Sequence, residues 1–376
     1  MTKAKLRDRL IDYMNNKRIS ISSINIVLLV TLPLLLILLW QLRSLIVILM
    51  ISVVLAATLA PIVNTTQNIG IPRVLAVLLV YAGLIGTLTG FGLIIGPTVA
   101  QQIQSLIGRF PGYLEALRSL LGNLILRFGL SDTGAIDIIN QLLDVQGLIS
   151  WGIRSSQQLV VRSYSVTRGI IGSVFSAVLA LLLSAYMLSA SKELLTDIIN
   201  LFPEPWNKRL AAQIHPVATR MGGYIQGRIL VSGILGVVIS VSLRFLGLSE
   251  LALGLGVIAG FTNLIPFFGP ILGAVPALIV STAQGGLTFV WVLLLFAIVQ
   301  NLETYVLDPL LVGNSVKVPP LYQLLAVLGG AQVLGIIGAL IVPPWVAGMG
   351  VLLENLYVKP KLMAEKHRDL EPVSME

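Results

Sequence analysis

The residues best suited to chemistry are two carboxylates that follow a long apolar run. Glu303 ends that run with Gln300 and Asn301 beside it, while Asp308 stands directly before Pro309. Ionisable side chains inside a membrane are rare and costly, so each is a candidate functional group. Glu303 could bind a cation or carry a proton. For both carboxylates the alternative is a structural role at the membrane surface, as a helix cap or an ion-pair partner.

A second group of candidates lies in a stretch dense in glycine and proline, Leu251–Thr282. Proline removes a backbone donor and clashes with the preceding turn, so this stretch cannot be one straight helix. We expect two half-helices that meet at Pro266–Pro270, or a re-entrant hairpin. Asn263, just before the break, either contacts a polar substrate or caps a half-helix.

A later apolar stretch, Leu321–Leu353, is interrupted in a similar way. Non-helical backbone at membrane depth is tolerated only where it is buried in protein or lines a cavity, and paired interruptions point to a transporter's binding site. The alternative is that glycine and proline only kink ordinary spans. The expected breaks are at Gly329-Gly330, Gly335, Gly338 and Pro343-Pro344. The pathway candidates lie in or beside the two broken stretches: Glu303, Asp308, Asn263, Pro266, Gly269, Pro270, Gln300, Asn301, Gly329 and Gly330.

The composition places these residues in a membrane. Apolar residues make up 56% of the chain and charged residues 11%, with a mean hydropathy of +0.92, whereas soluble domains carry about 25% charged residues. Backbone groups in lipid must be hydrogen-bonded internally, so apolar runs of about 20 residues predict transmembrane helices. We expect an all-α integral membrane protein of about eight spans, with broken or re-entrant helices in its C-terminal half and an extramembrane helical insertion after the third span.

The pattern of charge predicts the order of the chain's parts. Lys and Arg gather in both terminal segments, and positive charge favours the cytoplasmic side, so we expect both termini there. The expected parts are a basic leader (1–22), the N-terminal spans (23–100), an extramembrane amphipathic helical domain (101–168), a fourth span (169–190), a cytoplasmic amphipathic segment (191–227), a C-terminal transmembrane core (228–354) and a cytoplasmic tail (355–376).

Three local expectations follow from this order. The first two spans, Ile24–Trp40 and Leu45–Ala60, are separated only by Gln41–Ser44 and are expected to form a tight hairpin. The fifth span begins near Ile229. The residues that enter it, Gly222 to Arg228, are expected to anchor the helix at the membrane interface through Tyr224 and Arg228. The alternative is a contact with the substrate.

Several function classes are disfavoured. The chain has no cysteine and two histidines, and these lie without metal-ligand spacing, so we expect neither a metal site nor a cofactor. GxxxxGK[ST], GxSxG and HExxH patterns do not occur, so an enzyme or a built-in ATP motor is not expected. The net charge of +8 is interpreted as membrane topology rather than nucleic-acid binding. The expected partners are the lipid bilayer and a small solute, a cation or H+.

Short motifs in order along the chain resemble the AI-2E family, also called autoinducer-2 exporter-like or PerM-type permeases. Tyr224 to Gly227 is similar to the family's YxxGQ stretch, with Arg228 in place of the usual Gln. The other matching positions are Leu59 to Val63, which includes Pro61; Gly70 to Arg73; Ala76; Asn263 to Pro270 with Gly273 and Pro276; Glu303, Pro309, Gly313, Pro319, Gly329, Gly330, Gly335, Gly338 and Pro343.

The resemblance covers about residues 24 to 355. It implies about eight spans, cytoplasmic termini, a domain inserted after the third span and a homo-oligomer in the bacterial plasma membrane. It also implies export of a small solute, by analogy the autoinducer-2 furanone, or sodium/proton exchange in some relatives.

Three functions are therefore open. The leading hypothesis is a secondary or passive transporter whose pathway lies among the broken C-terminal segments. A cation/proton antiporter is the alternative within transport. A scaffold or regulator that transports nothing is the alternative of another class, with residues 101–168 or 191–227 binding a partner. It predicts a dry, sealed core around Pro266 and Glu303.

Overall fold

The computed structural model describes residues 40–127, 163–313 and 318–370, together with 31, 33–35, 37 and 38. These residues form α-helices and two π-helical segments, without any strand, as the sequence predicts. The chain divides into two units, Met1–Leu49 and Met50–Glu376. The basic leader, most of the expected first span and residues 128–162 of the expected insertion lie outside the described residues.

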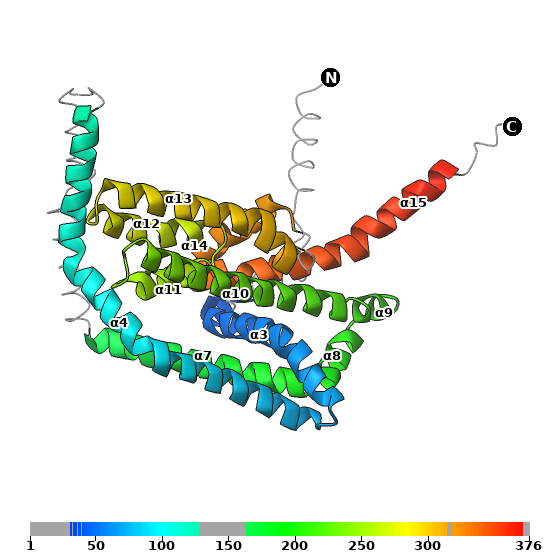
Figure 1. Ribbon diagram of the computed structural model, residues 1–376. Coiled ribbons are helices and arrows are strands. Elements are labelled where there is room, and N and C mark those ends of the chain that lie inside the picture. The colour runs from blue at the N-terminus through cyan, green and yellow to red at the C-terminus, as the bar shows by residue number, and fades with distance from the viewer. Residues whose placement is uncertain are drawn as a thin grey trace, which may run out of the picture. The chain divides into compact units, whose positions relative to one another are not determined.

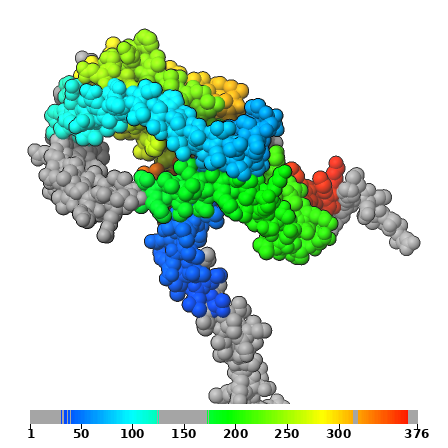
Figure 2. Space-filling model, turned by 90° about the horizontal axis from the view of Figure 1, so that it is seen from below, coloured from blue at the N-terminus to red at the C-terminus, as the bar shows by residue number. Residues whose placement is uncertain are grey.

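The N-terminal helices pack through small and aromatic side chains. They are α3 (Arg43–Asn68), α4 (Arg73–Arg127) and α7 (Ser163–Ser189). The Tyr81 and Ser184 hydroxyls share a buried hydrogen bond between α4 and α7, and Figure 2 shows these two helices side by side. The buried residues of this cluster are Leu59, Val63, Ala76, Val77, Tyr81 and Leu188.

Arg73 makes hydrogen bonds to residues at the ends of three helices. Its Nε donates to the Leu188 carbonyl at 2.8 Å and its Nη2 to Ser191 Oγ at 2.6 Å, while Nη1 lies 3.3 Å from Gln67 Oε1. The last carbonyls of a helix lack intrahelical partners, so the guanidinium satisfies one of them. Here the chain bends by 81° into α8 (Ser191–Asn200).

The C-terminal half forms a second bundle around α10. Its members include α10 (Ile214–Phe245), α11 (Ala252–Thr262), α12 (Phe268–Thr282) and α13 (Gly286–Leu302). Figure 1 shows these helices running alongside one another, and α10 contacts α11, α13 and α14 (Pro320–Leu353). Their shared core includes Tyr224, Val231, Leu235, Ile239, Leu243, Leu255, Ala259, Ala277, Val292 and Val299.

Helices α11 and α12 form a hairpin whose two open ends both contact α4. With 11 residues, α11 is about 17 Å long, too short to cross a hydrocarbon core of about 30 Å. At its start, Gly254 N–H donates to Gln102 Oε1 of α4 at 2.6 Å. At the end of α12, Thr282 Oγ1 lies 3.3 Å from the Tyr113 carbonyl, also of α4. Both open ends therefore meet the same helix, and the stretch forms two short helices joined near Pro266, as expected.

Glycine lets the two arms of this hairpin approach closely. A Cβ on Gly273 of α12 would lie 2.7 Å from the Ala259 Cα of α11. Between the arms, Phe267 adopts a positive φ of 67°, a conformation that is uncommon for a non-glycine residue. Pro266 and Gly269 are buried beside it.

The second expected break lies in α14 (Pro320–Leu353). Gly335 has φ 66° and ψ −153°, outside the helical region. Residues eight apart in a straight helix are about 12 Å apart, yet a Cβ on Gly338 would lie 2.7 Å from the Gly330 carbonyl carbon. The chain therefore folds back at Gly335.

A π-helical segment, η1 (Glu303–Gly313), continues α13, and Pro309 lies inside it. Because a proline has no N–H, Pro309 cannot donate a backbone hydrogen bond in this segment. A second π-helical segment, η2 (Glu354–Val358), leads from α14 into α15 (Lys359–Leu370). Asp308 therefore lies within a helical segment and does not end one.

Two N-terminal expectations were wrong. No hairpin forms at Gln41–Ser44, since Leu42 N–H donates to Leu38 O at 2.9 Å and Ile46 N–H to Leu42 O at 3.0 Å. That segment has no glycine or proline to break the helix. The second expected span was to end at Ala60, but α3 continues through Pro61 to Asn68.

Other boundaries also differ. The α4 helix continues without a break past residue 100 to Arg127, although Pro97 and Pro111 lie inside it. A six-residue helix, α9 (Trp206–Ala211), precedes α10, which begins at Ile214 rather than near Ile229. Within α14, only Gly335 departs from helical angles; Gly329-Gly330, Gly338 and Pro343-Pro344 remain helical.

Among the described residues, five helices are long and apolar enough to cross a membrane, and the bent pair that ends with α8 qualifies as a sixth if taken as one span. Helices α11 and α12 are shorter apolar helices, and the last of the five candidates contains the break at Gly335. The chain is thus an all-α, multi-pass membrane protein.

Candidate translocation site

A buried ion pair joins the middle of α10 to the end of α13. Arg228 Nη1 lies 2.9 Å from Glu303 Oε1, and each side chain is only 4% exposed. Asn263, at the end of α11, donates from Nδ2 to the same oxygen at 3.1 Å. A buried charge is tolerated when it is paired and hydrogen-bonded. Three segments far apart in the sequence therefore meet at the Glu303 carboxylate.

The π-helix brings a second carboxylate to the same arginine. Arg228 Nη1 lies 3.4 Å from Asp308 Oδ1, whose side chain is 41% exposed. In an α-helix residues 303 and 308 would point about 140° apart, since each residue turns about 100°. The i→i+5 pattern of a π-helix places them on nearly the same side, so Glu303 and Asp308 can share one guanidinium.

Close packing holds η1 against α10. A Cβ on Gly227 would lie 2.5 Å from the Leu311 carbonyl oxygen, a contact that no larger residue could make. Tyr224, one turn earlier and 2% exposed, has its hydroxyl 3.3 Å from Gln323 Nε2 of α14. These contacts hold α10 and η1 in the register that places Arg228 opposite Glu303 and Asp308.

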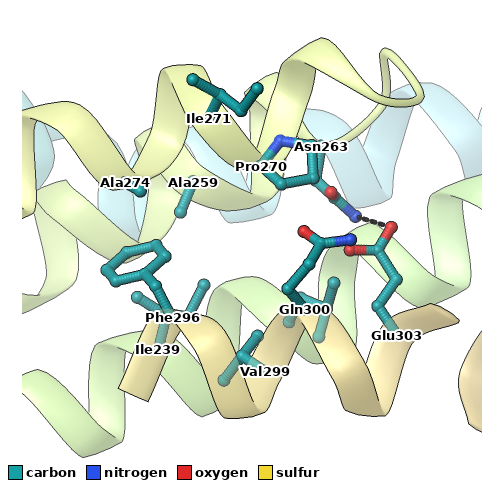
Figure 3. Close-up of a pocket in the computed structure, with 11 residues that line it drawn as sticks. Ile239, Ala259, Asn263, Pro270, Ile271, Ala274, Phe296, Val299, Gln300 and Glu303 are labelled. Atoms are coloured by element: carbon teal, nitrogen blue, oxygen red, sulfur yellow. Dashed lines mark hydrogen bonds between the residues drawn. The ribbon is translucent and has the colours of Figure 1, made fainter. Parts of the chain in front are cut away.

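A cavity of about 180 Å³ lies next to the ion pair. Figure 3 shows Asn263, Gln300 and Glu303 gathered at one end of it, with Ile271 and Phe296 among the apolar side chains at the other. The walls come from α10, α11, α12 and α13: Leu235, Ile239, Ala259, Asn263, Pro270, Ile271, Ala274, Phe296, Val299, Gln300 and Glu303. The cavity thus combines an apolar body with a small polar end.

The charges at this end do not cancel. One guanidinium faces two carboxylates, so the group of Arg228, Glu303 and Asp308 has a formal charge of −1 when all are ionised. Such a group attracts a cation or a proton and repels an anion. Within the described ranges, no cluster of three or more His, Cys, Asp or Glu side chains could hold a metal ion.

The structure brings together part of the expected pathway set. Asn263, Pro270, Gln300 and Glu303 line the cavity, and Asp308 joins them through Arg228. Pro266 belongs to the turn of the α11–α12 hairpin, and Gly269 lies in the first turn of α12.

The remaining three candidates lie elsewhere. Asn301 is exposed and donates to the Ala297 carbonyl of its own helix at 2.8 Å. Gly329 and Gly330 belong to the first arm of the α14 hairpin and do not line the cavity.

Arg228 is the residue that the sequence interpretation missed. It was expected with Tyr224 as an interfacial anchor, and this was wrong, since both are buried and Arg228 pairs with Glu303. A signal was present: an arginine beside a long apolar run requires a carboxylate partner, and Glu303 is available. The spacing in sequence could not reveal that they meet.

Several other prolines of the family motifs lie within helices and do not line the cavity. Pro61 lies inside α3, Pro276 inside α12 and Pro343 in the second arm of α14. Pro309 lies within η1, and Gly313 ends it.

Comparison with known proteins identifies the family. The family model described as AI-2E family transporter matches residues 26–358. "Putative transport protein YrrI" of Bacillus subtilis (strain 168) is 30% identical over 315 residues, covering 81% of this chain and 84% of that protein. "Putative transport protein YueF" of the same organism is 25% identical, covering 76% and 77%. "Putative permease PerM" of Escherichia coli (strain K12) is 26% identical, covering 74% and 78%. The chain therefore belongs to the AI-2E transporter family.

Proposed function

We propose that this transporter exports a small polar solute of the autoinducer-2 type across the plasma membrane, driven by an ion gradient or by the solute's own gradient. Glu303 is the central binding group, and the α11–α12 hairpin with α13 and η1 forms the route. The protein works as a homo-oligomer with both termini in the cytoplasm.

The observation that carries the proposal is the cavity beside a buried carboxylate. Drug-sized ligands occupy pockets of about 300–1,000 Å³, so a cavity of about 180 Å³ suits a smaller molecule. Arg228 lies near the middle of α10, and transporter sites are typically near the bilayer midplane beside discontinuous helices. A cavity at this place supports transport over the dry, sealed core of a scaffold.

Cation/proton antiport is the second candidate, and one observation favours it. The formal charge of −1 on the group around Glu303 would be neutralised by one Na+ or one H+. Exchange at a single carboxylate then couples the two ions. Antiport predicts sodium-dependent proton flux without an organic solute, whereas solute export does not.

Flux from liposomes tests both candidates. The full chain is reconstituted, and efflux of the autoinducer-2 furanone and flux of protons are measured with and without sodium and pH gradients. Glu303→Gln is expected to lower the transported flux about ten- to hundredfold, since a hydrogen bond to a charged group contributes about 1.5–3 kcal/mol and 1.4 kcal/mol is tenfold.

Asn301→Ala is the matched control, because Asn301 lies two residues away but bonds only its own helix. It should retain wild-type flux. Equal rates and equal pH dependence in wild type and Glu303→Gln would remove Glu303 from the mechanism.

A further inference from the structure

Two buried polar atoms beside the ion pair need a partner. Arg228 and Ser232 are each 4% exposed and lie four residues apart on α10, hence on one face. Among the described side chains, Arg228 Nε and Ser232 Oγ are the buried polar atoms that make no hydrogen bond within the protein. Buried polar groups almost always have a partner, so these atoms indicate a binding site.

This pair adjoins the polar end of the cavity. The face of α10 that carries Ser232 continues to Leu235 and Ile239, which line the cavity. Arg228 is bonded to Glu303, another lining residue. On the α11 side, a Cβ on Gly260 would lie 2.9 Å from the Ser232 carbonyl oxygen. Arg228 and Ser232 therefore lie on the face of α10 that carries the lining residues Leu235 and Ile239.

The chemistry of the two atoms selects the ligand. An arginine Nε–H only donates, so its partner must offer a lone pair, which a metal cation cannot do. The excess carboxylate among Arg228, Glu303 and Asp308 disfavours an anion. A serine hydroxyl both donates and accepts. The partner that satisfies all three conditions is a neutral oxygen.

We propose that Arg228 Nε and Ser232 Oγ form a subsite for a hydroxyl oxygen of a small neutral solute, whose carbon skeleton lies in the apolar part of the cavity. The subsite rests on the proposed transport function for its role, while its binding chemistry is tested without flux. Because the oxygen of water has the same chemistry, the test separates water from solute.

The absence of cysteine from the chain allows a direct test. Ser232→Cys introduces a single thiol, and the full-length variant in detergent is treated with neutral, cationic and anionic methanethiosulfonate reagents. Ser240→Cys is the matched control, since Ser240 is on the same helix but its Oγ donates to the Gly236 carbonyl at 2.8 Å. A Cβ on Gly256 would collide with that same Oγ, so position 240 faces a packed interface.

The expected result has three parts. Ser232→Cys reacts with the neutral reagent while Ser240→Cys does not. Its reaction with the anionic reagent is slower than with the cationic one by about tenfold or more, as the local negative charge requires. Glycerol or erythritol slows the reaction of Ser232→Cys. An inert Ser232→Cys, an equal rate with both charged reagents, or reaction without protection by either polyol, which would mean water only, overturns the proposal.

Flux of erythritol into liposomes separates this proposal from the transport function. Ser232→Ala is expected to lower that flux about two- to tenfold, the effect of losing one hydrogen bond, while Ser240→Ala leaves it unchanged. Protection of Ser232→Cys without flux of any solute by the wild type would overturn transport and leave the subsite standing. Transport of a solute that Ser232→Ala does not change would overturn the subsite alone.

Discussion

Arg228 is surrounded by unequal partners. Its contact with Glu303 is 2.9 Å long and buried on both sides, whereas Asp308 is 3.4 Å away and 41% exposed. Removing one member of a buried ion pair leaves an uncompensated charge in a medium that solvates it poorly. The consequence depends on which member is removed, because Glu303 has Arg228 as its cationic partner while Arg228 has two carboxylates.

This asymmetry gives a stability prediction. Arg228→Gln leaves the buried Glu303 carboxylate without a cationic partner and is expected to destabilise the protein by about 3–5 kcal/mol. Glu303→Gln should destabilise it less, since Asp308 still faces the guanidinium. The double variant should recover part of the loss. Thermal unfolding of the full chain in detergent measures all three.

Arg109→Gln serves as the control for charge loss. It breaks the pair with Glu250, whose side chains are 61% and 74% exposed, and exposed pairs contribute little. Unfolding of Glu303→Gln at a lower temperature than Arg228→Gln would contradict the asymmetry.

The two hairpins depend on glycine for different reasons. Gly335 provides a backbone conformation, with φ 66° and ψ −153°, that is essentially restricted to glycine. Gly273 and Gly338 provide close approach between arms. The first requirement concerns the turn itself, and the second concerns the helices that it joins, so the two are separable by substitution.

Gly335→Ala tests the turn. Open space surrounds a Cβ at this position, so the expected loss of about 1–3 kcal/mol comes from backbone strain alone. Gly329→Ala is the control, because Gly329 is helical in the same element and also faces open space. Equal unfolding temperatures for Gly335→Ala and Gly329→Ala would show that residue 335 does not need this conformation.

Gly227→Ala tests the approach of η1 to α10. The new methyl would lie 2.5 Å from the Leu311 carbonyl oxygen, and such overpacking destabilises by about 1–3 kcal/mol. Because η1 carries Asp308, solute flux should fall as well. Gly233→Ala, on the same helix with nothing within 4 Å, should change neither. Wild-type behaviour of Gly227→Ala would mean that η1 is not held by this contact.

Contacts between distant segments bear on the orientation of the whole chain. The start of α10 meets the segment after α14: Asn355 Nδ2 donates to Gln213 Oε1 at 2.7 Å, and Arg220 lies 3.5 Å from Glu354. At the other end of α10, Glu250 pairs with Arg109 of α4 at 2.9 Å. Gln213 and Asn355 therefore lie together at one end of α10. The distribution of Lys and Arg predicts that the basic segments around Lys208 and Lys366 share one membrane face.

Single cysteines test this orientation, since the chain has none of its own. Lys208→Cys and Lys366→Cys are expected to react with a membrane-impermeant thiol reagent only from the cytoplasmic side. Arg109→Cys should react only from the opposite side, because Lys208 lies before the start of α10 and Arg109 contacts Glu250 beyond its end, and α10 has 32 residues. Labelling of Lys208→Cys and Arg109→Cys from the same side would overturn the proposed topology.

The linear order of residues was enough to predict the membrane class, the helical fold and the two broken segments. The class and the helices depend on local composition, because lipid demands apolar helices. Gly335 was one of several breaks expected in Leu321–Leu353, and it is the one at which the chain leaves helical angles. The linear order also singled out Glu303, because a carboxylate bordering apolar sequence stands out wherever its partner lies. The family resemblance, which depends on short motifs in order, was equally accessible.

Only the folded chain decided what Glu303 does there. Its pairing with Arg228 joins residues 75 positions apart. Glu303 and Asp308 share this arginine because the segment between them is a π-helix, which no local sequence pattern distinguishes from an α-helix. The extent of α4 and α10 was likewise not visible in the sequence, since Pro97 and Pro111 lie inside α4 and polar residues lie inside α10. Distances between helices, and the cavity that they enclose, arise from how side chains of separate segments fit together, and that fit is absent from any single stretch of sequence.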